Sequence, residues 1–166
     1  MKLTVKNKYL SPLGSSYVLD EQKKKRYRIK GTISFTAKKR ILDMNRSLHY
    51  VVRNKFFAPI TPRVFIYNHA GVKVATVSTN RYDFKNRYDV VSDTDSIILS
   101  GNLFQFPDMK LEITKNGIKI GTLTKKFNLM RDVFTIEADN AEEESFLIAL
   151  VIAVDNIIDR YLKKSR

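Results

Sequence analysis

A run of basic residues near the N-terminus is the feature of the sequence with the clearest chemical potential. Residues 23–30 read KKKRYRIK, which places six basic residues among eight. In an extended strand every second side chain points to the same face, so such residues form a row with neighbours ~6.6 Å apart. A row of cations attracts phosphate groups. We therefore expect an anionic-ligand-binding ridge on an outward strand face, made of Lys24, Arg26, Arg28 and Lys30 and extended by Lys38, Lys39 and Arg40.

Several interpretations of this ridge stay open. The row serves equally well as a solvated outer face, or as a charged sheet edge that discourages aggregation. The ligand we expect first is the anionic phospholipid headgroup at a membrane surface. Nucleic acid is an alternative, because aromatic residues occur near basic ones as stacking platforms do, and a protein-interaction scaffold is another. The aromatic residues are Phe56, Phe57, Tyr82 and Tyr88, and Lys125 and Lys126 join the ridge if the fold brings them near.

The sequence offers little for catalysis or metal binding. The chain has no cysteine and only two isolated histidines, His49 and His69, so neither thiolate chemistry nor a zinc site is expected. The acidic segment from Glu137 to Ser145 carries carboxylates for calcium, but it lacks the EF-hand pattern and suits the start of a helix. Nucleophile, phosphate-loop and zinc-protease motifs are missing. We expect a non-enzymatic protein without cofactor or metal.

Length and composition favour one globular domain. The 166 residues, 43% hydrophobic and 28% charged, are ordinary for a folded protein with a sizeable core. We expect a single domain over 1–166 and a monomer. Thirty Lys and Arg residues against seventeen acidic ones give a formal net charge of +13, which favours polyanionic partners. The first residues lack the apolar run of a signal peptide, so we expect a cytoplasmic protein that is peripheral when membrane-bound.

A repeat of about 23 residues organises the chain. Residues 64–91 align with 111–137, and a shared shift in apolar phase predicts β-bulges at Ala75 and Gly121. Each unit is too short for a strand-helix-strand crossover and therefore corresponds to two antiparallel strands. About twelve such strands leave open edges unless they close into a barrel. The repeat is marked by Leu19, Leu42, Ile66, Val90, Ile113 and Ile136, with gaps of 23 or 24 residues.

One predicted strand shows which side faces inward. Between residues 23 and 36 the odd positions are mostly apolar and the even positions are mostly basic. Because side chains alternate across a strand, the odd row is predicted to face the core and the basic row to face solvent. The predicted inward side chains are Tyr27, Ile29, Ile33 and Phe35.

The segment EEESFLIALVIAVDNIID, residues 142–159, is predicted to be a buried helix. Its apolar part covers thirteen residues, 146–158, whereas a membrane-spanning helix needs ~20, so no transmembrane segment is expected. Nine consecutive apolar residues cover every side of a helix, which must therefore be surrounded. A barrel of about twelve strands has a lumen that such a helix can fill. We expect strands over about 2–138 and the helix over about 140–162, with Asp155 and Asp159 where it emerges toward solvent.

Taken together, these features resemble the tubby-like fold and, more closely, the LURP-one-related family in its bacterial form. The resemblance rests on the opening MKLTVKNKYLSPLGSSYVLDEQ, the repeated KNGIKIGTLTKKF and the closing VFTIEADNAEEESFLIALVIAVDNIID, and it spans essentially the whole chain. It implies a mainly β protein, a closed antiparallel barrel of about twelve strands around the hydrophobic C-terminal helix. It also implies a binding module, since tubby relatives bind phosphoinositides through basic residues and phospholipid scramblases are distant relatives.

Overall fold

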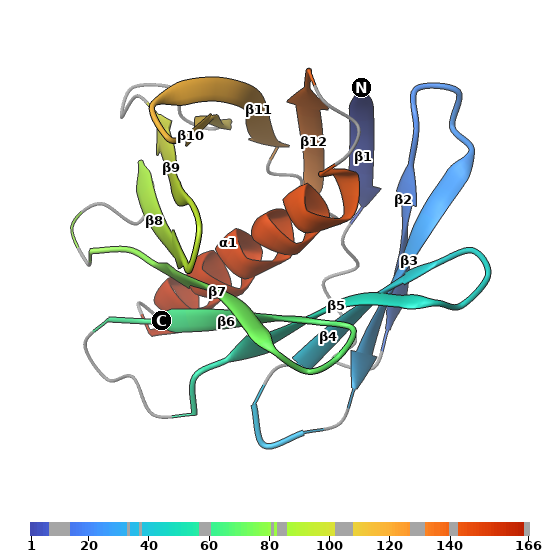
Figure 1. Ribbon diagram of the computed structural model, residues 1–166, viewed down its shortest axis with the longest axis horizontal. Coiled ribbons are helices and arrows are strands. Elements are labelled where there is room, and N and C mark those ends of the chain that lie inside the picture. Colours follow the sequence, from blue (N-terminus) through green and yellow to red (C-terminus); the bar gives the residue numbers. More distant parts are fainter. Residues whose placement is uncertain are drawn as a thin grey trace.

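The computed structural model describes residues 1–6, 14–32, 34–36, 38–56, 61–80, 82, 86–101, 108–126, 132–139 and 143–164. Within these ranges the chain forms twelve strands followed by one helix (Figure 1). The elements are β1 (Lys2–Lys6), β2 (Ser15–Leu19), β3 (Lys25–Thr32), β4 (Lys38–Asp43), β5 (Leu48–Asn54), β6 (Arg63–Asn68), β7 (Lys73–Ser78), β8 (Arg87–Ser92), β9 (Ser96–Gly101), β10 (Met109–Lys115), β11 (Ile118–Lys126), β12 (Val133–Ala138) and α1 (Glu144–Lys164).

The strands form one closed antiparallel barrel. Each strand pairs with its neighbours in sequence, and β1 closes the barrel by pairing with β12. The closing pair extends over five residues of each strand, from Lys2 opposite Glu137 to Lys6 opposite Val133. The predicted mainly β barrel is therefore confirmed, and its closure leaves no strand edge open for aggregation.

The repeat places a β-bulge at the same point in four hairpins. In each case the second strand carries one extra residue: Arg26, His49, Val74 and Ile120. Ala75 and Gly121, the predicted positions, pair in register with Ile66 and Ile113, so each bulge lies one residue earlier than predicted. A bulge reverses the alternation of side chains along its strand, which decides how nearby charges are oriented.

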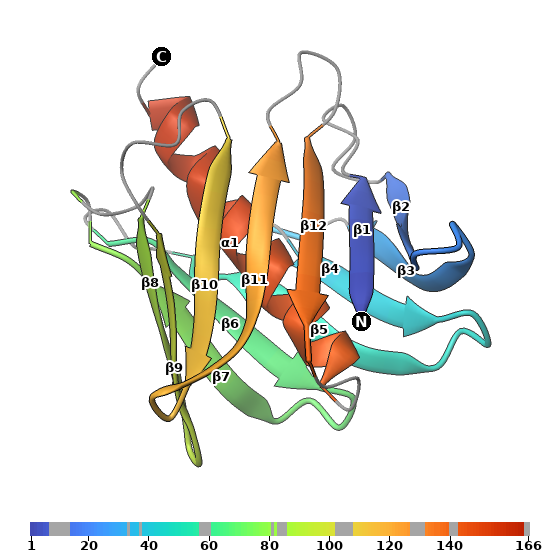
Figure 2. The same cartoon turned by 90° about the horizontal axis from the view of Figure 1, so that it is seen from above.

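Helix α1 fills the barrel. Every residue from Leu147 to Ile158 is buried, and strands enclose the helix in two perpendicular views (Figure 1, Figure 2). The apolar faces of the strands meet the helix in a single core. The helix begins at Glu144 rather than near residue 140, and Glu143 lies in the turn before it.

Strand β3 ends earlier than its apolar alternation suggests. Ile29 and Gly31 are buried as the alternation predicts, and Tyr27 is half-buried. Pairing with β4 stops at Thr32, so the chain beyond it no longer alternates between core and solvent. Phe35, predicted to face the core, is instead 98% exposed in a bend, and Ile33 lies outside the described residues.

Among the described residues, no helix combines the length and apolar character needed to cross a bilayer.

Candidate anion-binding face

The seven basic residues of the predicted ridge do not share one face. Lys24 is exposed in the turn before β3, where its backbone N–H donates to Oδ1 of Asp20 over 2.8 Å. Arg26 is the bulge residue of β3, and its Nη2 lies 3.3 Å from Oε2 of Glu144 at the start of α1. Arg26 is exposed, but as the bulge residue it pairs with Glu144 and is set apart from Arg28 and Lys30.

Lys39 faces inward. It lies opposite Val52 and two residues before Ile41, both of which are buried. Its Nζ lies 3.6 Å from Oδ2 of Asp155 on α1. Lys39 is therefore not placed beside the outward ridge residues, and the carboxylate of Asp155 provides its counter-charge inside the barrel.

A second lysine is buried completely beside the same aspartate. The side chain of Lys125 is 0% exposed, and its Nζ lies 2.7 Å from Oδ2 of Asp132 and 3.2 Å from Oδ1 of Asp155. Burial by itself lowers the pKa of Lys125, but the two carboxylates outweigh it, so its pKa lies above the ordinary value. Lys125 thus cannot join an outer ridge, and Asp155 is buried rather than directed toward solvent.

Four outward cations on three neighbouring strands do come together. Lys30 on β3 lies opposite Arg40 on β4, and Lys38 on β4 lies opposite Arg53 on β5. Directly opposed side chains have Cβ atoms only ~5 Å apart, and like charges at such positions repel each other. We name Lys30, Lys38, Arg40 and Arg53 the cation quartet. Its repulsion would be relieved by a bound anion, which makes it the strongest candidate site.

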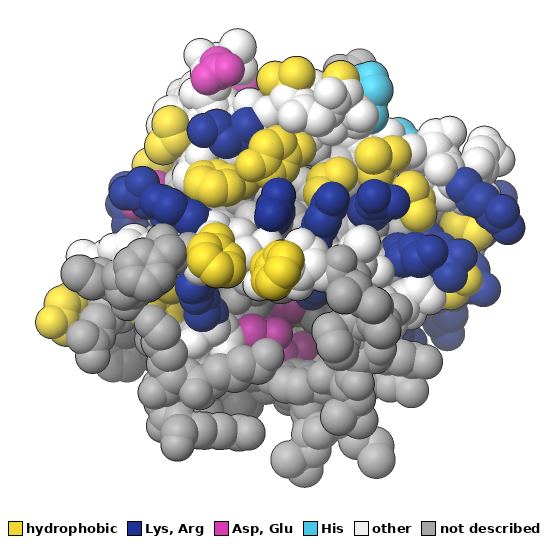
Figure 3. Space-filling view, turned by 90° about the horizontal axis from the view of Figure 1, so that it is seen from below, with side chains coloured by type: hydrophobic (Ala, Val, Ile, Leu, Met, Phe, Trp, Pro, Cys, Tyr) yellow, Lys and Arg dark blue, Asp and Glu magenta, His cyan; other side chains and the backbone are white. Residues whose placement is uncertain are grey.

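The quartet belongs to a larger basic face, defined as the outward Lys and Arg side chains on β3 to β7 between Arg28 and Lys73. Lysine and arginine side chains alternate with hydrophobic ones across this side of the barrel (Figure 3). Phe65 and Tyr67 lie among them, and Nζ of Lys73 lies 5.4 Å from the ring centroid of Phe65. The basic face consists of Arg28, Lys30, Lys38, Arg40, Arg53, Arg63 and Lys73.

None of these seven side chains forms an ion pair with a carboxylate in the part of the chain that the structure describes. Arg28 has a hydroxyl partner, Oγ of Ser15 at 3.4 Å, and Arg53 donates from Nε to Oγ1 of Thr36 over 3.1 Å. Both contacts orient a guanidinium group without neutralising it. The basic face therefore keeps its positive charge.

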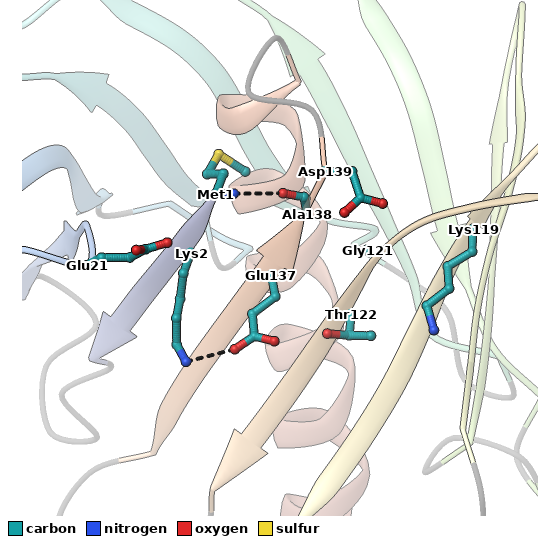
Figure 4. A pocket seen from close by; sticks show the side chains of 9 residues that line it. All are labelled: Met1, Lys2, Glu21, Lys119, Gly121, Thr122, Glu137, Ala138 and Asp139. Atoms are coloured by element: carbon teal, nitrogen blue, oxygen red, sulfur yellow. Dashed lines mark hydrogen bonds and ion pairs between the residues drawn. The ribbon is translucent and has the colours of Figure 1, made fainter.

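Several outward charges of the remaining strands are paired with the opposite charge. Ion pairs join Lys2 to Glu137 at 2.7 Å and Lys119 to Glu112 at 2.8 Å. A cavity of about 420 Å³ lies beside them, between β1, β11 and β12 (Figure 4). Its lining mixes both signs of charge: Met1, Lys2, Glu21, Lys119, Gly121, Thr122, Glu137, Ala138 and Asp139. This mixed lining gives an anion less attraction than the basic face does.

Sequence reasoning did not identify Arg53, Arg63 and Lys73 as members of the face. Each is an isolated cation in sequence, and only the pairing order of β4 to β7 places it beside the ridge residues. The period-two alternation within residues 48–54 and 63–68 was the available signal, because it marks Arg53 and Arg63 as outward.

The aromatic residues considered for base stacking separate into different environments. Tyr88 is buried in the core, so it cannot stack on a base. Phe56 and Tyr82 are exposed, and Phe57 lies outside the described residues. Phe65 and Tyr67, which sequence reasoning passed over, are the aromatic side chains on the basic face itself.

Carboxylates of the acidic segment are directed to separate cations. Glu137 pairs with Lys2, Glu143 with Lys115 and Glu144 with Arg26. Residues 140–142 lie outside the described part of the chain. Across the described ranges no three His, Cys, Asp or Glu side chains are grouped for a metal ion.

A sequence profile of one family matches most of the chain. The profile is described as LURP-one-related, and it matches residues 1–155. The matched range contains all twelve described strands and the buried first half of α1. No curated protein and no solved structure matches the chain.

Proposed function

The chain belongs to the LURP-one-related family, and we propose that it is a non-enzymatic module that binds anionic phospholipid headgroups at a membrane surface. The observation that carries this proposal is the cation quartet on the outer face of β3, β4 and β5. Lys30, Lys38, Arg40 and Arg53 are two like-charged pairs in direct opposition, with no described carboxylate to neutralise them. Repulsion of this kind is relieved when a phosphate group lies between the cations.

The dimensions of the quartet suit a lipid headgroup. Neighbouring strands lie ~4.8 Å apart, and outward residues of one strand lie ~6.6 Å apart. The quartet therefore presents cations over an area about 10 Å by 7 Å, which is wide enough for a headgroup with more than one anionic oxygen. The other three cations of the basic face extend the attraction, because each Lys or Arg near an anionic bilayer contributes about 1 kcal/mol.

The rest of the fold supports a binding role rather than catalysis. The interior of the barrel is occupied by α1 (Figure 2), and the space beside Lys39 and Asp155, between the strands and the helix, measures about 10 Å³ and is too small for a substrate. The buried charges of Lys125, Asp132 and Asp155 pair with one another and with Lys39. The proposal includes a single domain over 1–166 that acts as a monomer, in the cytoplasm and peripherally at the membrane.

Co-sedimentation with lipid vesicles tests this function. The protein is expected to sediment with phosphatidylcholine vesicles that contain phosphatidylserine or a phosphoinositide, and to stay in solution with phosphatidylcholine alone. Binding should weaken as salt is raised, because the attraction is electrostatic. Equal binding to neutral and anionic vesicles, or no binding to either, would contradict the proposal.

Nucleic acid is the alternative that one observation favours, namely the position of Phe65 and Tyr67 among the cations of the basic face. Parallel filter binding to single-stranded and duplex DNA at 150 mM salt distinguishes the two functions. Retention of DNA together with failure to sediment with anionic vesicles would replace the lipid proposal with the nucleic-acid one.

A further inference from the structure

Three exposed aromatic side chains lie at one end of the barrel. They are Phe35, Phe56 and Tyr82, with exposed fractions of 98%, 74% and 85%. They belong to the connections β3 to β4, β5 to β6 and β7 to β8. In an antiparallel barrel whose strands follow chain order, alternate connections lie at the same end, so these three are neighbours along one rim. Hairpins are spaced by two strand separations, ~10 Å, which places the three rings on an arc of ~20 Å.

In each of these connections, a described residue near the aromatic side chain is hydrogen-bonded. Thr36, next to Phe35, is buried and accepts the hydrogen bond from Nε of Arg53. Lys55, next to Phe56, donates its N–H to the carbonyl of Arg63 over 2.9 Å, and its own carbonyl lies 3.3 Å from Nη1 of Arg160 on α1.

The third connection is hydrogen-bonded in the same way. Thr79, just after β7, is buried and its hydroxyl donates to the carbonyl of Arg87, and the N–H of Tyr82 donates to Oδ1 of Asn80 over 3.3 Å. All three aromatic side chains therefore lie in solvent although the chain near each of them is hydrogen-bonded. Aromatic rings held in solvent next to cations are groups of the kind that enter a membrane interface.

The same rim borders the basic face. Lys38 starts the strand that follows Phe35, Arg53 lies three residues before Phe56, and Arg63 starts the strand that follows it. The described residues of the three connections are Ser34, Phe35, Thr36, Lys55, Phe56, Thr61, Pro62, Thr79, Asn80, Tyr82 and Asn86, and none of these is acidic. Apolar tips are thus combined with a mainly positive border, although in sequence Asp83 follows Tyr82 in the β7 to β8 connection.

We propose that this rim is the membrane-inserting end of the molecule, with Phe35, Phe56 and Tyr82 entering the headgroup region of an anionic bilayer. This inference rests on the proposed function, and it specifies how the protein is oriented on the membrane. The C-terminal end of α1 points toward the lipid, and Lys38, Arg53 and Arg63 contact headgroups at the level where the aromatic rings enter. Aromatic side chains beside cations are the combination that partitions into the membrane interface.

A fluid bilayer suits these tips better than a protein partner does. The three rings stand on separate connections, with polar residues such as Ser34, Thr61 and Asn80 between them. The centre of a protein interface is one contiguous, close-packed cluster, whereas lipid adapts around single inserted rings. Nucleic acid would require each exposed ring to stack flat on a base along the rim.

The absence of tryptophan from the chain allows a direct test. Single Phe35→Trp, Phe56→Trp and Tyr82→Trp variants each carry one fluorescent reporter at the rim. Ile118→Trp is the matched control, because Ile118 is 71% exposed in the β10 to β11 hairpin at the opposite end of the barrel. Each protein is mixed with phosphatidylcholine vesicles that contain phosphatidylserine, with or without brominated acyl chains that quench tryptophan.

We expect blue-shifted emission and quenching by brominated lipid at positions 35, 56 and 82, and neither change at position 118. In addition, Phe35→Ser and Phe56→Ser should each weaken partitioning onto anionic vesicles about tenfold, as expected for loss of a buried aromatic ring.

The outcomes separate this inference from the proposed function. If wild type sediments with anionic vesicles but the three rim reporters do not respond, the inference is overturned and the proposed function stands. If wild type does not sediment, both are overturned. Reporters that respond to single-stranded DNA and not to vesicles also overturn both, in favour of nucleic acid.

Discussion

Replacement of Lys125 by methionine is expected to destabilise the protein severely. The methionine keeps most of the side-chain volume but removes the ammonium group that lies 2.7 Å from Asp132 and 3.2 Å from Asp155. Asp155 retains Lys39 at 3.6 Å, whereas Asp132 has no second ion-pair partner among the described residues. Stranding a buried carboxylate costs about 3–5 kcal/mol, a large part of the 5–15 kcal/mol that typically stabilises a domain.

Urea unfolding followed by far-UV circular dichroism measures this loss. Lys126→Met is the matched control, because Lys126 is the next residue on β11 and its side chain is exposed. The control should change the free energy of unfolding by no more than about 0.5 kcal/mol. Adding Asp132→Asn to Lys125→Met should restore about 2 kcal/mol, since it removes the stranded charge.

The effect should also depend on pH with a defined sign. The pKa of Lys125 is raised above 10.5 in the folded protein, so its contribution to stability is fully present below pH 10.5. The contribution is lost as the pH rises through the folded-state pKa. At pH 7, a loss in the free energy of unfolding for Lys125→Met that is no larger than that for Lys126→Met would refute the buried ionic cluster. If Lys125→Met does not fold, Asp132→Asn alone supplies the comparison.

Three further predictions concern the barrel. Ala149→Lys should yield no soluble, cooperatively melting protein, because Ala149 is fully buried on α1 and an unpaired ammonium there has no partner; a soluble variant with a sharp thermal transition would contradict the enclosed helix. Gly121→Ala should cost about 1–3 kcal/mol in thermal unfolding, since its Cβ would lie 2.5 Å from the carbonyl oxygen of Glu137, and an unchanged melting temperature would count against this close approach. Asn116→Gly should raise the pKa of Asp95 toward 3.8, measured by NMR titration, because the Asn116 amide is the main cause of its lowered value. An unshifted titration of Asp95 in the variant would exclude the Asn116 amide as that cause. In wild type, the contribution of Asp95 to stability is present above pH 3.8 and lost as the pH falls through its lowered pKa.

The architecture could be predicted because apolar spacing reports directly on burial. Leu19, Ile66 and Ile113 recur at the repeat interval, and an apolar run on every side of a helix requires an enclosing structure. Two of the bulges are also visible in the sequence as a change in the phase of the apolar positions. The positions predicted from that change lie one residue after the observed bulge residues, Val74 and Ile120. The C-terminal end of β3 was harder to predict, because Phe35 continues the apolar alternation after the pairing with β4 has ended at Thr32.

The candidate site was only partly predictable, because a run of charges does not indicate which way each one faces. The bulge at Arg26 turns that residue toward Glu144, a partner 118 positions away in sequence. Alternation with buried Ile41 and Leu123 marks Lys39 and Lys125 as inward, but the carboxylate that pairs with both, Asp155, lies on the last element of the chain. Such a long-range pairing leaves no local signal.

The cation quartet itself depends on strand register. Lys30, Lys38 and Arg40 were selected from sequence as members of the ridge, but Arg53 joins them only through its pairing with Lys38. A one-residue change in the register of β5 would direct Arg53 to the interior. Neither charge nor composition specifies that register in advance.

The central proposal, that the basic face binds anionic lipid, is tested most directly by two variants of equal charge. One carries Lys30→Gln, Lys38→Gln and Arg40→Gln, and the other carries Lys23→Gln, Lys24→Gln and Arg46→Gln at exposed positions outside the basic face, in the turns at the opposite end of the barrel. Both lose three of the +13 charges, and their partition coefficients onto phosphatidylserine vesicles are compared at 150 mM salt. The first should bind about a hundredfold more weakly than wild type, at about 1 kcal/mol for each cation. The second should stay within about threefold, because charges beyond a Debye length of ~8 Å are screened. Equal weakening of both variants, or wild-type binding by the first, would contradict the account.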